Sequence, residues 1–126
     1  MPITTLINTS TLLAGGGMET SGQSVQVAPA VANERAEEAP SALLSHVSGD
    51  QNGTLYVLQG IDPTVLNAVV DPTLAPDTVL VTTHAFVGGT PANYSDALRA
   101  PYVRAIYVNG VANQTRFALW VGAVLS

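Results

Sequence analysis

Residues 100–125 read APYVRAIYVNGVANQTRFALWVGAVL, and this stretch decides the fold. Two runs rich in β-branched and aromatic residues, 102–108 and 116–125, flank a polar loop. The loop contains Asn109-Gly110, which is a strong short-range signal for a β-hairpin. The sequence therefore predicts two antiparallel strands joined directly by this loop.

Both runs carry apolar residues on each face of the expected strands. Side chains alternate between the two faces of a strand, so Val103 and Tyr107 share one face. Tyr102 and Ile106 share the other face. Because neither face is purely polar, we expect a sheet covered by a second sheet on one side and by a partner protein on the other.

Short strand-like runs separated by turn residues recur through the rest of the chain. The expected strands are 41–47, 54–59, 66–70, 78–86 and 94–98, and the turn residues 49–53 join the first two as a second hairpin. Turn signals at a spacing of about 8–12 residues are typical of a sandwich or barrel. We expect an all-β protein, an antiparallel β-sandwich of jelly-roll or immunoglobulin-like type.

The first 30 residues differ from the remainder. They contain β-prone Thr, Ile and Leu, then the run Gly15-Gly16-Gly17, which is flexible and costly inside a packed element. We expect residues 1–30 to form an extended N-terminal arm hinged at the three glycines, and 31–126 to form the sandwich domain. The arm is either ordered by a partner or a frayed terminus.

Composition excludes several classes of function. The chain has no cysteine, its only cations besides histidine are four arginines, and its net charge is −5. A chain without lysine has no P-loop and no Schiff-base nucleophile. Few phosphates could be neutralised, so we expect neither nucleic acid nor a membrane surface as a partner.

We find no residue pattern that indicates catalysis. His46 and His84 lie within strand-like runs, where a histidine is more often a hydrogen-bonded filler than a general base. The aspartates lie beside turn residues, and their spacing does not suit a calcium site. We therefore expect no catalytic, cofactor-binding or metal-binding residues, and no enzymatic activity.

A set of arginine and aromatic residues around the expected hairpin forms the candidate interface. Its members are Arg99, Arg104, Arg116, Tyr102, Tyr107 and Trp120. Arginines on paired strands repel each other unless each has a carboxylate or carbonyl partner, from Asp96 or from another subunit. The alternatives are solubilising charges for the arginines, and core anchors or a sugar-stacking platform for the aromatic residues.

Three segments carry a resemblance to a known group of proteins. They are GDQNGTLYV at 49–57, APYVRAIYVNG at 100–110 and QTRFAL at 114–119. The chain resembles small β-sandwich proteins encoded among the head genes of tailed bacteriophages, which are similar to capsid decoration, or cement, proteins. The group's pattern continues after the first segment with a Ser-x-Asp-Gly turn and a tryptophan, where this chain has Gly60–Thr64.

The resemblance implies a structural virion protein on the exterior of the capsid. Its partners would be the major capsid protein and other copies of itself, as a homotrimer or a homodimer. Many weak contacts across a repeated lattice would then add up through avidity. The alternative is a carbohydrate- or receptor-binding β-sandwich module of a phage tail or fibre.

Overall fold

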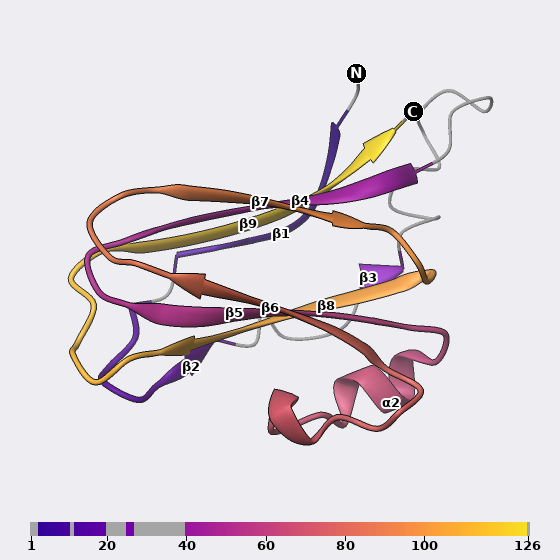
Figure 1. Cartoon of the computed structure of the whole chain (residues 1–126), viewed down its shortest axis with the longest axis horizontal. Helices are drawn as coiled ribbons and strands as arrows, with labels where there is room; N and C mark the ends of the chain where they lie inside the picture. The colour runs from indigo at the N-terminus through magenta and orange to yellow at the C-terminus, as the bar shows by residue number, and fades with distance from the viewer. Residues whose placement is uncertain (1–2, 11, 20–24, 27–39, 126) are drawn as a thin grey trace.

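The computed structural model describes residues 3–10, 12–19, 25–26 and 40–125. In these ranges the chain forms two antiparallel sheets that pack face to face (Figure 1). The expected all-β sandwich is confirmed. Among the described residues no helix is both long enough and apolar enough to cross a membrane.

The first sheet, sheet A, has four strands. Their order across the sheet is β1 (Ile3–Thr9), β9 (Phe117–Leu125), β4 (Pro40–Gly49) and β7 (Ala92–Ala97). Strand β1 contains a bulge between Thr5 and Ile7.

The second sheet, sheet B, is built around β8. Its order is β2 (Met18–Glu19), β8 (Tyr102–Asn109), β5 (Gly53–Gly60) and β6 (Leu80–Phe86), and β3 (Val25–Gln26) also pairs with β8. Strand β8 therefore lies inside sheet B, and apolar residues from both of its faces are buried. This burial explains why the strand carries apolar residues on each face.

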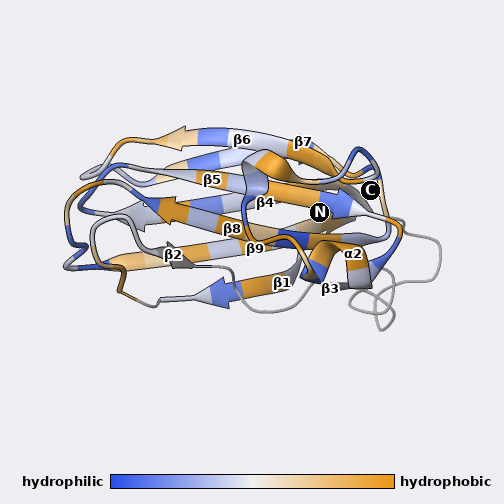
Figure 2. Cartoon of the chain, turned by 90° about the horizontal axis from the view of Figure 1, so that it is seen from below, coloured by the Kyte–Doolittle hydropathy of each residue, from blue (hydrophilic) through white to orange (hydrophobic). Residues whose placement is uncertain are grey.

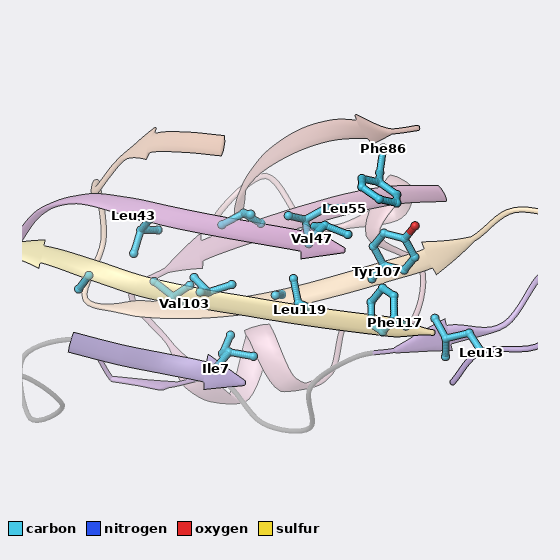
Figure 3. Packing of buried hydrophobic residues seen from close by; sticks show 14 residues of the cluster. Ile7, Leu13, Leu43, Val47, Leu55, Phe86, Val103, Tyr107, Phe117 and Leu119 are labelled. Carbon is cyan, nitrogen blue, oxygen red and sulfur yellow. The ribbon is translucent and has the colours of Figure 1, made fainter. Parts of the chain in front are cut away.

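The main core lies between the two sheets (Figure 3). Every second residue of β8 and β9 points into it, including Val103, Tyr107, Phe117 and Leu119. The ring of Tyr107 lies 4.7 Å from that of Phe117. Alternation of side chains along each strand thus supplies the core from both sheets.

The two expected hairpins are wrong. Strand β8 belongs to sheet B and β9 to sheet A, and in the same way β5 and β4 lie in different sheets. The connections at 110–116 and 50–52 therefore cross between sheets instead of folding a strand back on its neighbour. The Asn109 side chain donates hydrogen bonds to the carbonyls of Leu13, Ala14 and Ala112, so this Asn-Gly pair serves a packed loop.

The expectation of a separate N-terminal arm is also wrong, because residues within 1–30 belong to the sandwich. Ile3–Thr9 pairs with β9 along its length, and Ile7 is buried in the main core. The three glycines form a docked turn rather than a free hinge. Gly16 has a φ of 74°, its N–H donates to Gly110 O at 2.6 Å, and Gly15 N–H donates to Asn113 Oδ1 at 2.8 Å.

The strand expected at 66–70 is replaced by helical turns. Helix α2 (Pro63–Asn67) begins after Asp62, and the 3₁₀ helix η1 (Pro72–Leu74) begins after Asp71. Each aspartate accepts a hydrogen bond from a backbone N–H two residues later. An Asp-Pro pair is therefore an N-cap followed by a first helical residue here, rather than a simple chain break.

Residues 61–79 form what we call the cap segment, which packs on one part of the outer face of sheet B, over Leu58 and Ile106. Figure 2 shows its apolar stretches and α2 at one end of the sheet. The chain itself thus covers Ile106 of β8, while Tyr102 and Val108 on the same face are partly buried.

Candidate functional site: an apolar surface on the cap segment

The cap segment is attached to sheet B by a second apolar cluster. Leu66 and Val69 from the cap pack with Leu58 of β5 and Ile106 of β8, and all four are buried. Burial of side chains of this size contributes about 1.5–3 kcal/mol each. The inner side of the cap is therefore fixed on the sheet.

Arg104 holds the same segment through polar contacts. Its Nη1 donates hydrogen bonds to Leu66 O at 2.6 Å and to Val69 O at 2.8 Å. The side chain is buried, and this burial lowers the pKa of Arg104. The guanidinium meets carbonyls at the C-terminal end of α2, where positive charge is favourable.

The outer side of the cap exposes large apolar side chains. Ile61, Val70 and Leu74 are 75%, 81% and 79% exposed. Between α2 and η1 lies a hollow of about 440 Å³, lined by Val65, Ala68, Val69, Val70, Asp71, Leu74 and Pro76. We call this hollow and its exposed apolar rim the cap surface.

Asp71 places a charge at the rim of the cap surface. Its carboxylate accepts hydrogen bonds from the Thr73 hydroxyl at 2.7 Å and the Thr73 N–H at 2.9 Å. These bonds lower the pKa of Asp71 and keep it ionised at neutral pH. An apolar hollow with a few polar groups at its rim has the general character of a binding site.

A second group of exposed apolar residues lies at the opposite end of the strands. Leu12, Val87 and Val111 protrude from the loops there. Beneath them, Gln114 binds the loop at 50–51 and the side chain of Asn109. This loop end is therefore rigid, although its exposed side chains line none of the hollows that we describe.

The structure does not bring the expected interface residues together. Tyr107 lies in the main core and Arg104 lies beneath the cap, so neither is on a surface that a partner could contact. Tyr102 packs against the second cluster, and Arg99 and Arg116 are exposed at different positions. Trp120 lies on the outer face of sheet A.

The structure shows the expected kind of partner for one of the three arginines. Arg104 has carbonyl partners, as its position on a central strand requires. Asp96 does not serve an arginine, because both of its carboxylate oxygens face His84 Nε2, at 2.8 and 3.0 Å. His84 also stacks on Tyr94 at 4.3 Å, so it closes the side of the sandwich between β6 and β7 as a hydrogen-bonded filler.

The residues of the cap surface were not singled out by the sequence. The signal that could have found them is the pair Asp62-Pro63 and Asp71-Pro72, which starts two helical turns only nine residues apart.

In the part of the chain that the structure describes, no group of three acidic or histidine side chains could hold a metal ion.

Comparison with known proteins gives a likeness of fold. No family model matches the chain, and no curated protein matches it significantly. The crystal structure of PBSX exported protein XepA is 16% identical with a TM-score of 0.67, and the match covers 99% of this chain and 37% of that one. The crystal structure of PirA is 10% identical with a TM-score of 0.48, and 93% of each chain is covered.

The likeness to XepA shows a shared β-sandwich architecture. The chain spans only about 37% of the length of XepA, so the match concerns one part of that protein.

Proposed function

We propose that this protein is a structural virion protein, a capsid decoration protein that binds the outer surface of a phage major capsid shell and stabilises it. The observation that carries the proposal is the cap surface, where the exposed side chains of Val70 and Leu74 line a hollow on a segment that is packed on sheet B. The resemblance of three sequence segments to phage head proteins supports the same role. The shared fold with XepA, a phage-related protein, is consistent with it.

The cap surface suits a contact made in many copies. Exposed apolar groups around a hollow favour protein association, while a patch of this size gives only modest affinity for one copy. On a shell with repeated binding positions, oligomeric copies would gain affinity by avidity. The role requires no reaction centre, only a surface that is held in shape before binding.

Attachment to phage heads tests the proposal. Leu74→Asp places a charge on the rim of the cap surface, and Val111→Asp is the matched control because Val111 is fully exposed at the loop end. Cosedimentation with heads that lack this protein should show a dissociation constant raised at least about tenfold for Leu74→Asp, since binding would then bury an unpaired charge, which costs more than about 1.4 kcal/mol. Val111→Asp should bind as the unmodified protein does.

Two results would contradict this assignment. Equal head binding by unmodified protein and Leu74→Asp would show that the cap surface is not the contact. Absence of binding by the unmodified protein would reject the decoration role itself. Thermal melts of both variants confirm that only the surface has changed.

A further inference from the structure

The outer face of sheet A is not covered by any segment that the structure describes. The cap segment lies on the other sheet, as Figure 1 shows, and contacts β5 and β8. One row of residues crosses the uncovered face from β1 to β7. Strand register places Asn8, Trp120, His46 and Asn93 side by side in this row.

The indole ring of Trp120 lies flat on this face. A Cβ at Gly122 would overlap the ring, so the glycine leaves the space that the ring occupies. The indole Nε1–H donates to Thr5 Oγ1 at 3.0 Å, which fixes the ring in its plane. One side of the ring is therefore held against the sheet, and the other side is directed outward.

Uncharged hydrogen-bonding groups surround the ring. His46 Nδ1 lies 2.7 Å from Asn93 Oδ1 at an exposed position. When Nδ1 donates this bond, His46 Nε2 is left as an acceptor and the Asn93 amide nitrogen as a donor. Asn8 adds a second amide on the other side of Trp120.

The face carries no formal charge among its described residues. Its outward positions on β1, β9, β4 and β7 hold Ile, Thr, Asn, Ala, Trp, Gly, Val, Leu, His and Ser. A chain with a net charge of −5 has thus kept its carboxylates away from this surface. The occupant that matches such a face is itself neutral and rich in hydroxyl groups.

We propose that this face binds a neutral carbohydrate, with one pyranose ring stacked on Trp120 and its hydroxyl groups bonded to His46, Asn93 and Asn8. The apolar C–H side of a pyranose fits the flat ring, and amide and imidazole groups serve its hydroxyls. This activity is independent of the cap surface and lies on the opposite face of the sandwich. A decoration protein bound through its cap would present this face outward.

The single tryptophan makes the proposal directly measurable. Trp120 is the only tryptophan of the chain, so its fluorescence reports on this face alone. The probes are hexasaccharides of β-1,4-glucose, α-1,4-glucose, β-1,4-N-acetylglucosamine, β-1,4-xylose and α-1,6-mannose. At least one should give a saturable change in emission, and calorimetry should give the same dissociation constant.

Variants assign the binding to the proposed residues. Trp120→Ala should weaken binding, followed by calorimetry, at least about tenfold, as expected for loss of a central aromatic anchor. Asn93→Ala alters an exposed residue of the edge strand β7 and should weaken binding with the fold intact. Leu74→Asp should bind sugar unchanged, which separates this site from the cap surface.

The proposal is overturned by any of three results. The first is no change of emission with every probe up to about 10 mM, beyond the range of weak specific binding. The second is binding that persists in both Trp120→Ala and Asn93→Ala. The third is a change of emission with protein concentration alone, which would show that a second copy covers the face.

Discussion

Arg104 is a single buried cation that holds the cap segment in position. It joins the central strand β8 to two carbonyls of the cap segment, at Leu66 and Val69. We expect Arg104→Met to lower the free energy of unfolding by about 2–3 kcal/mol, because it removes two charge-assisted hydrogen bonds and takes the Arg104 donor away from the Val69 carbonyl. Urea denaturation measures the effect. Arg99→Met, at an exposed position, is the control and should change stability by less than about 0.5 kcal/mol.

Asp50 links two loops at the loop end and gives the fold an acid sensitivity. Its carboxylate accepts bonds from the Thr115 hydroxyl at 2.7 Å and from the N–H groups of Thr115 and Arg116. These bonds hold the pKa of Asp50 far below its usual value of about 3.9. A depressed folded pKa contributes stability that is complete above the unfolded pKa and is lost as pH falls towards the folded one.

We therefore expect Asp50→Asn to lower the melting temperature at pH 7. The difference from the unmodified protein should shrink as the pH falls below about 4, where the carboxylate of the unfolded chain is protonated. Melting curves between pH 2 and 7 test this, with Asp77→Asn at an exposed turn as the control. A difference that stays constant over this range would show that the charge of Asp50 does not matter.

Tyr107 carries a polar atom that the core does not satisfy. Its hydroxyl is buried without a hydrogen-bond partner and lies where a Cβ of Gly53 would be. We expect Tyr107→Phe to raise the free energy of unfolding by about 1 kcal/mol, because the cost of an unpaired buried hydroxyl disappears. Gly53→Ala should destabilise the protein, and less so when combined with Tyr107→Phe. Loss of stability in Tyr107→Phe would mean that the hydroxyl is bonded in solution.

At the scale of elements, β1 decides whether the N-terminal residues are an arm or part of the domain. Ile7 is buried and Ile3 is 47% exposed although they are four residues apart, because the bulge between Thr5 and Ile7 shifts the alternation of side chains. We expect Ile7→Ala to cost about 2–4 kcal/mol of stability, as for other buried isoleucines, and Ile3→Ala to cost less than about 1 kcal/mol. Equal effects in chemical denaturation would indicate that β1 does not dock on β9.

Most of the strands could be predicted from the sequence, with 66–70 as an exception, whereas their partners could not. Alternation and β-branched residues are local properties, and they place strands close to where the structure has them. Pairing depends on which strands share a core, and that information is not local. Asn109-Gly110 has the composition of a hairpin turn, yet Asn109 bonds to carbonyls at Leu13 and Ala14, which are distant in sequence.

The candidate site was predicted in one respect only. The expected carboxylate or carbonyl partner of Arg104 is found, although the premise that Arg104 and Arg116 lie on paired strands is wrong, because β8 and β9 belong to different sheets. The cap differs from the strand expected at 66–70 because an aspartate precedes each of Pro63 and Pro72 and caps a helical turn. The position of Trp120 beside His46 follows from pairing between β9 and β4, which no local pattern encodes.

At the scale of the whole molecule, large apolar side chains are also exposed outside the cap surface and the loop end, at Leu80 and Val81 of β6. Such patches favour association. We expect light scattering at about 100 µM, well above the micromolar range of weak complexes, to give the mass of two or three chains. A monomer at this concentration would show that the protein does not self-associate. Oligomeric copies could then not raise the affinity for the shell by avidity.

The order of strands in sheet A has a consequence for synthesis on the ribosome. Strand β9 comes last in the sequence but lies between β1 and β4. Until it emerges, β1 has no neighbour in the sheet, and β4 has only β7. Sheet A therefore has to wait for β9, and its folding is dominated by contacts between residues that are distant in sequence, which makes it slow.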